Sequence, residues 1–327
     1  MTRFTLPLFS LTLLLTACGD DETAAPDAAT PLSIAATAQA TPELSSLVAA
    51  VQFASDNHDL LDLISNPGTL TVFAPTNAAF DALAVELTGS AGAKGPDLLT
   101  AANKPLLRAV LKYHVLTSEV RAAGIPFGRA ITSAEGSVFK IESGSPPVIT
   151  DGRNRTSRIT ATDITASNGV VHLIDKVILP ANKSIVETAQ ALAGATQPQF
   201  TILVEAVVAA DLAGTLSGPG PFTVFAPTDA AFAALLAELG VTKSQLLANK
   251  PLLTKVLTYH VVSGRVLKAD VPVGPSIATV ETGTFTVNGQ LEITDERGRK
   301  SKIIGTDTFA SNGVIHVIDK VILPAAN

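Results

Sequence analysis

Residues that bind metals or form disulfides are scarce in this sequence. Its 327 residues include one Cys, one Met and no Trp. A single Cys cannot form an internal disulfide, and it excludes zinc sites and iron–sulfur clusters that need several Cys ligands. The role of that one residue, Cys18, is therefore the first question that the sequence raises.

An excess of positive charge is also missing. The chain has 23 Lys and Arg against 29 Asp and Glu, a net charge of −6. This argues against a nucleic-acid-binding protein, which needs a basic surface to displace counterions from phosphates. Hydrophobic residues make up 46% and charged residues 16%, so a wholly disordered chain is not expected. The length is typical of two ordinary domains.

Residues 1–17 are typical of a bacterial export signal. Arg3 supplies a positive start, and a mostly apolar run extends from Phe4 to Leu15. That run is short and contains Pro7, so a permanent transmembrane helix is the weaker interpretation. The stretch Leu15-Thr16-Ala17-Cys18 resembles a bacterial lipobox. The resemblance implies cleavage before Cys18 and lipidation of that residue; the alternative is an ordinary secretory peptide that contains a Cys.

Residues 18–41 are rich in Ala, Thr, Asp and Pro and show no apolar period. We expect them to be a flexible, acidic linker that carries the lipidated Cys18 at its start. The residue after it is Gly19 rather than Asp. By resemblance to enterobacterial sorting, this favours the outer membrane over the inner one. The expected location is the bacterial cell envelope, lipid-anchored, at the outer membrane or cell surface.

The rest of the chain repeats itself. Four segments recur in the same order: Thr71–Phe80 as Thr223–Phe232, Asn103–Leu107 as Asn249–Leu253, Tyr113–Val115 as Tyr259–Val261, and Asn168–Pro180 as Asn312–Pro324. The period is far longer than any solenoid repeat and matches the size of an independent domain. We predict two domains, at residues 42–181 and 182–327, closely coupled by a very short joint.

Each unit has helical patterns in its first half and strand patterns in its second half, which predicts an α+β fold. Thr76 is placed to N-cap a helix after the β-type segment Leu70–Ala74, and Asn103 is placed to cap the next helix. In the second unit, Asn288-Gly289 separates two strand-like runs, which predicts a hairpin with a type I′ turn.

The repeated blocks resemble the conserved segments of fasciclin domains. These blocks are Thr-Val-Phe-Ala-Pro-Thr, the Tyr-His pair, and Asn-Gly-Val-x-His-x-Ile-Asp-x-Val-Ile-Leu-Pro, each present twice. The resemblance implies two tandem fasciclin-like domains, each a wedge or sandwich of β-strands flanked by helices. It also implies extracellular adhesion and matrix interaction as the usual role, although a fold by itself does not fix a function.

The Tyr-His pairs contain every Tyr of the protein: Tyr113-His114 and Tyr259-His260. In animal members of the family this region is implicated in integrin recognition, so the resemblance marks all four residues as candidates for partner binding. The alternative is structural. A His at the C-terminal end of a helix can bond its carbonyls, and a Tyr can bury its ring while its hydroxyl finds a partner.

Catalytic and metal-binding patterns are weak. His172 and His316 are each followed three residues later by Asp175 and Asp319, but residues three apart on a strand point to opposite faces. We expect these histidines to be hydrogen-bonded inside the fold, and His58 to lie at the surface. No Gly-x-Ser-x-Gly or Walker-type loop occurs. We therefore expect no catalytic residue, no metal and no cofactor.

A basic turn occurs in both units of this acidic protein. Arg153, Arg155 and Arg158 follow Asp151-Gly152, and Arg297, Arg299, Lys300 and Lys302 follow Asp295-Glu296. A solvated turn is the simpler interpretation. The sharper hypothesis is contact with an anionic polysaccharide or with the other domain, made by Arg153, Arg155, Arg158, Arg297, Arg299 and Lys300.

Taken together, these features predict a non-enzymatic adhesion or interaction module of the cell envelope. Its partner would be a protein or polysaccharide of the cell surface or matrix, and its only contact with the membrane would be the lipid anchor. Two alternatives stay open: a hydrolase acting on envelope polymers, and a periplasmic assembly factor that holds one protein partner.

Overall fold

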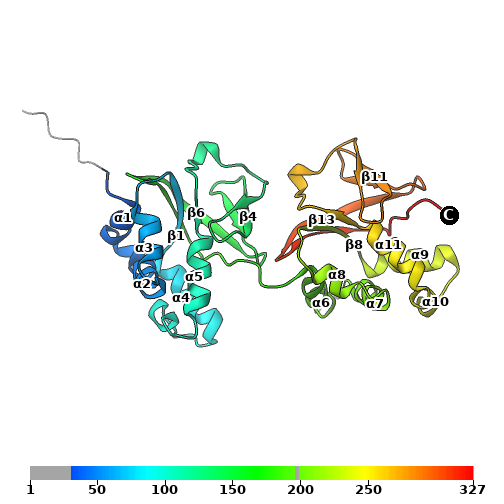
Figure 1. Ribbon diagram of the computed structural model, residues 1–327, viewed down its shortest axis with the longest axis horizontal. Helices are drawn as coiled ribbons and strands as arrows, with labels where there is room; N and C mark the ends of the chain where they lie inside the picture. The colour runs from blue at the N-terminus through cyan, green and yellow to red at the C-terminus, as the bar shows by residue number, and fades with distance from the viewer. Residues whose placement is uncertain (1–30, 196–198, 327) are drawn as a thin grey trace, which may run out of the picture. The chain divides into compact units, whose positions relative to one another are not determined.

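The computed structural model describes residues 31–195 and 199–326. These residues form one compact unit, in which a seven-stranded sheet with flanking helices occurs twice (Figure 1). The α+β fold expected from the sequence is confirmed. Cys18 and the export signal lie outside the described residues.

The two repeats contain matching elements in the same order. The first repeat consists of α1 (Ile34–Ala40), η1 (Pro42–Leu44), α2 (Ser45–Ala54), α3 (Asp59–Ser65), β1 (Leu70–Pro75), α4 (Asn77–Thr88), η2 (Gly95–Leu98), α5 (Lys104–Tyr113), β2 (Val115–Leu116), η3 (Ala122–Gly124), β3 (Ile131–Thr132), β4 (Val138–Glu142), β5 (Val148–Thr150), β6 (Thr156–Ala166) and β7 (Gly169–Ile174). The second repeat consists of α6 (Ile185–Ala193), α7 (Thr201–Ala209), α8 (Ala213–Ser217), β8 (Phe222–Pro227), α9 (Asp229–Leu239), α10 (Lys243–Ala248), α11 (Lys250–Tyr259), β9 (Val261–Ser263), η4 (Lys268–Asp270), β10 (Ser276–Ala278), β11 (Thr284–Val287), β12 (Glu292–Thr294), β13 (Lys300–Ala310) and β14 (Gly313–Ile318).

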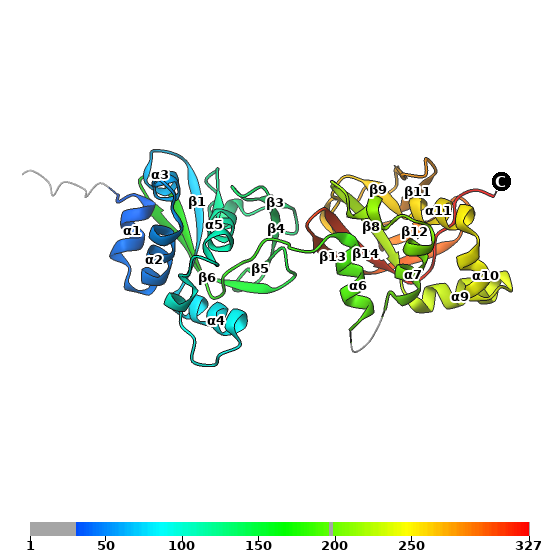
Figure 2. The same ribbon diagram turned by 60° about the horizontal axis from the view of Figure 1, so that its bottom comes forward.

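Each sheet has one parallel pair among antiparallel neighbours. The strand orders are β2-β1-β7-β6-β5-β4-β3 and β10-β11-β12-β13-β14-β8-β9. The early strand β1 pairs in parallel with the final strand β7, and β8 pairs likewise with β14. Figure 2 shows β14 between β13 and β8. Almost every residue of β7 and β14 is buried, as expected for strands covered on both faces.

Each repeat has two hydrophobic cores, because neighbouring residues of the same strands, such as Val72 and Phe73 of β1, belong to different clusters. One core packs the helices against β1 and β7, and the other joins Phe73, Tyr113 and Phe139 with the remaining strands. Figure 1 shows α1–α5 along one side of the first sheet and β4 away from them. Register shifts within β6 and β13 are typical of β-bulges, which bend a strand and increase its twist.

The start of the first repeat differs from the prediction. We expected a flexible linker up to residue 41, but Ile34–Ala40 forms the helix α1. The Ser33 side chain caps this helix, and Ile34 and Ala38 are buried in the core. The buried Asn168 side chain accepts a hydrogen bond from the Ile34 amide at 2.8 Å. The linker prediction is therefore wrong for residues 34–40, where packing overrides an Ala- and Thr-rich composition.

The predicted hairpin is present, but its turn is wider than expected. Strands β11 and β12 pair with Val287 opposite Ile293, and four residues, Asn288 to Leu291, lie between the end of β11 and the start of β12. The positive φ lies at Leu291, at 58°. The Asn288 side chain accepts hydrogen bonds from the amides of Gln290 and Glu292, and these bonds stabilise the longer loop in place of a type I′ turn.

The two repeats also contact each other. Lys140 of β4 bonds to the buried carboxylate of Asp307 in β13 at 2.8 Å. The Asn154 side chain bonds to both the amide and the carbonyl of Phe309. Burial lowers the pKa of Lys140, but its hydrogen bonds to Asp307 and Glu142 outweigh this effect and the net pKa is raised. Asn154 belongs to the basic turn of the first repeat, but it is not one of the residues predicted there to contact the other domain.

Candidate functional site

The Tyr side chains of the Tyr-His pairs are fully buried. The Tyr113 hydroxyl donates to the Val138 carbonyl at 2.7 Å and accepts from the Gly152 amide at 2.9 Å. Tyr259 makes the matching bonds to Thr284 and Glu296, at 2.6 and 3.2 Å. Burial raises the pKa of both hydroxyls, so they stay protonated. Each Tyr joins helix α5 or α11 to the strands of the second core.

The adjacent His side chains are buried at the C-terminal ends of the same helices, each 2% exposed. His114 Nδ1 lies 2.7 Å from the Val110 carbonyl oxygen, and the Ile178 amide donates to Nε2 at 3.1 Å. Because a carbonyl only accepts and an amide only donates, the proton of the neutral ring sits on Nδ1. His260 makes the same bonds to Val256 and Ile322. Burial lowers the pKa of both rings to about 4.

The four side chains of the Tyr-His pairs therefore do not lie at the surface. We do not retain Tyr113, His114, Tyr259 and His260 as partner-binding residues, because the fold encloses them and uses their polar atoms. The structural alternative explains the repeated pair: the Tyr and the His connect the end of one helix to loops distant in the sequence.

The histidines of the final strands have the opposite tautomer. His172 is fully buried; its Nδ1 accepts from the Asp163 amide at 3.2 Å and its Nε2 lies 2.8 Å from the Val120 carbonyl. His316 is bonded in the same way to Asp307 and Val266. The expectation of hydrogen-bonded internal histidines is confirmed, and His58 is exposed as predicted.

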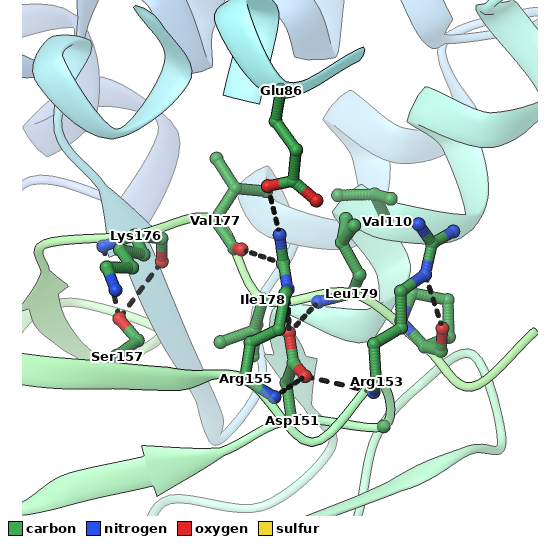
Figure 3. Close-up of polar contacts among 12 residues, drawn as sticks. Glu86, Val110, Asp151, Arg153, Arg155, Ser157, Lys176, Val177, Ile178 and Leu179 are labelled. Atoms are coloured by element: carbon green, nitrogen blue, oxygen red, sulfur yellow. Dashed lines mark hydrogen bonds and ion pairs between the residues drawn. The ribbon is translucent and has the colours of Figure 1, made fainter. Parts of the chain in front are cut away.

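The predicted basic turn of the first repeat encloses a buried carboxylate (Figure 3). Asp151 is 1% exposed and accepts from the amides of Arg153, Arg155 and Leu179, each at 2.9 Å. Arg155 adds bonds from Nε and Nη2 to the same carboxylate, and its Nη1 donates to Glu86 of α4 at 2.7 Å. Its Nη2 also donates to the Val177 carbonyl. All three side-chain nitrogens of Arg155 thus form hydrogen bonds within the fold.

The matching turn of the second repeat is less completely bonded. Asp295 accepts from the amides of Arg297, Arg299 and Leu323. The Arg299 side chain donates from Nη2 to Glu238 at 2.8 Å, and its Nη1 is buried without a hydrogen-bond partner. The two arginines occupy the same position of the repeat, yet Arg299 leaves donors unpaired that Arg155 uses.

The other predicted polyanion residues have different surroundings. Arg153 and Arg297 donate from Nε to the carbonyls of Pro180 and Pro324, which holds each turn against the end of its repeat. Arg158 is exposed, and Lys300 is exposed and bonded to Glu292 at 3.0 Å. The structure places Lys320 in the same cavity wall as Arg299 and Lys300, and our sequence analysis missed it.

Within 31–195 and 199–326, no group of three or more His, Cys, Asp or Glu side chains is arranged to hold a metal ion. In the same part of the chain, no helix has the length and apolar character needed to cross a membrane.

Comparison with known proteins identifies the repeats. Residues 42–180 and 198–324 match the family model of the fasciclin domain. The chain is 31% identical over 262 residues to the transforming growth factor-beta-induced protein ig-h3 of Sus scrofa, covering 80% of this chain and 35% of that protein. It is 52% identical over 128 residues to protein sll1483 of Synechocystis, covering 38% of this chain and 67% of that protein.

A solved structure also matches: the FAS1 domain pair from the insect cell adhesion molecule fasciclin I. It covers 85% of this chain and 97% of that chain, with 18% identity and a TM-score of 0.41. This chain spans about a third of the length of ig-h3, of which 35% is covered. The match of the family model to both repeats shows that the chain belongs to the fasciclin family and contains two fasciclin domains in tandem.

Proposed function

We propose that this chain is a non-enzymatic adhesion or interaction module held at the bacterial cell envelope by a lipid. The proposal rests on the hydrogen bonds that the buried histidines make. Both ring nitrogens of His114, His172, His260 and His316 are within hydrogen-bond distance of backbone groups. Side chains of the type best suited to acid–base chemistry thus serve the fold. Recognition then falls to exposed residues, in keeping with family membership.

The lipid anchor is a separate part of the proposal and rests on the sequence Leu15-Thr16-Ala17-Cys18. We expect the full chain, expressed in a Gram-negative host, to incorporate radiolabelled palmitate and to fractionate with the outer membrane. The Cys18→Ser variant should lose the label and should no longer fractionate with the outer membrane. Label that persists in the Cys18→Ser variant, or its absence from the wild-type chain, would contradict lipidation at this residue.

The binding proposal is tested on residues 18–327 carrying Cys18→Ser. We expect this protein to retain envelope polysaccharide or a small set of surface proteins in a pull-down, and to bind selected glycans on an array. A heat-unfolded sample of the same protein is the control for nonspecific retention. Recovery of one stoichiometric protein and no glycan would favour an assembly factor. Hydrolysis of an envelope polymer by the purified protein would overturn the non-enzymatic proposal.

A further inference from the structure

The second repeat has a cavity of about 370 Å³ beside the turn that follows Asp295. One wall is apolar and consists of Ala231, Ala234 and Leu235 of α9. The volume is within the usual range for small-molecule pockets, about 300–1,000 Å³. The cavity is therefore large enough for a single sugar residue.

Positive charge predominates in the rest of the lining. Arg299, Lys300 and Lys320 line the cavity together with one carboxylate, that of Glu238. Arg299 pairs with Glu238 at 2.8 Å, and Lys300 pairs with Glu292 at 3.0 Å. Among the described residues, no acidic side chain lies within salt-bridge distance of Lys320. The lining of this cavity is therefore positively charged on a protein of net charge −6.

In the first repeat, the arginine at the same position has a hydrogen-bond acceptor for each of its side-chain nitrogens. Arg155 donates from Nε, Nη1 and Nη2 to Asp151, Glu86 and the Val177 carbonyl. Arg299 donates from Nη2 to Glu238, while its buried Nη1 has no partner. Buried donors are nearly always paired, because an unpaired charged donor is costly. In the second repeat, Nη1 of Arg299 thus lacks an acceptor.

We propose that this cavity binds the carboxylate of an acidic sugar residue within a polysaccharide. The guanidinium of Arg299 turns from its buried position so that two of its N–H groups face the carboxylate, the geometry in which arginine binds carboxylates best. Lys320 supplies a second cation, and the C–H face of the sugar ring packs on Ala231, Ala234 and Leu235. The inference rests on the proposed function and names its ligand class.

The test uses residues 18–327 with Cys18→Ser and tetragalacturonate as the probe, in titration calorimetry at low ionic strength. We expect binding to tetragalacturonate and none to its methyl-esterified, neutral form. Arg299→Gln should weaken binding at least about tenfold, because it removes the charge-assisted hydrogen bonds of the guanidinium. Lys320→Ser should weaken it severalfold. The matched control is Lys176→Ser, the exposed lysine at the same position of the first repeat, which should leave binding unchanged.

Thermal unfolding establishes that each variant is folded, and Arg299→Lys, which keeps the charge, should retain part of the affinity. Unchanged binding by Arg299→Gln and Lys320→Ser would overturn the proposal. An equal loss in Lys176→Ser would assign the binding to general charge attraction, and equal competition by poly-glutamate would assign the site to acidic peptides. If the envelope pull-down succeeds while tetragalacturonate does not bind, this inference fails and the proposed function stands.

Discussion

Lowering the pH from 7 to 4 is expected to reduce the free energy of unfolding of each repeat by about 3 kcal/mol through one buried histidine. The pKa values of His114 and His260 are about 4 in the folded protein, against an ordinary value of 6.5. Between these values the unfolded chain binds a proton that the folded chain excludes. Stability therefore falls as the pH drops below about 6.5 and levels off below about 4.

The structural cause is the neutral tautomer that the fold imposes. Nε2 of His114 accepts the Ile178 amide, so a proton there would break this bond and place two donors face to face. Urea unfolding followed by circular dichroism at several pH values measures the effect. His114→Gln should be less stable at neutral pH but should lose part of the pH slope. His58→Gln, at an exposed position, should keep the whole slope. An unchanged slope in His114→Gln would contradict the assignment.

Local signals predicted the elements whose ends are fixed by their own side chains. Thr76 and Thr228 cap α4 and α9 through hydrogen bonds to the third amide of each helix. Gly89 ends α4 in the left-handed conformation that glycine allows. The internal repeat supplied a second kind of evidence that a single domain would not provide, because each conserved block could be aligned with its copy. The α+β fold and the tandem arrangement followed from these two kinds of evidence.

The first helix of each repeat was missed for a physical reason. Helices α1 and α6 are short, and their stability comes from packing and from Asn168 and Asn312, which bond to their first amides. These asparagines lie over 120 residues away in the sequence, so no local pattern reveals the contact. For α6 one local signal exists: Ser184 and Glu187 form a capping box.

The sequence predicted which types of residue occur at the candidate site, but not which hydrogen bonds their side chains form. The sequences around Arg155 and Arg299 are similar, and the two arginines pair with Glu86 of α4 and Glu238 of α9. Whether the same arginine also turns inward to Asp151 or Asp295 depends on side-chain orientation, which the sequence does not encode locally. Lys320 reaches the cavity because β13 and β14 are paired antiparallel, a long-range contact.

The Arg155 side chain bonds to Asp151, whereas the Arg299 side chain does not bond to Asp295. We therefore expect Asp151→Asn to destabilise the first repeat by about 3–5 kcal/mol, the usual cost of breaking a buried ion pair. The carboxylate is buried and accepts bonds from three amides and the Arg155 guanidinium. An Asn side chain keeps one acceptor and turns an NH₂ group toward these donors, so Arg155 is left partly unpaired inside the fold.

Asp295→Asn is the matched control, since Asp295 accepts three amides but no bond from the Arg299 side chain. Its expected cost is smaller, about 1–3 kcal/mol, because only hydrogen bonds to neutral donors are disturbed. Urea unfolding of both variants at neutral pH measures the difference. Added salt should restore little of the stability of Asp151→Asn, because the lost pair is buried and weakly screened. Equal losses at the two positions would show that the ion pair of the first turn contributes nothing beyond its amide bonds.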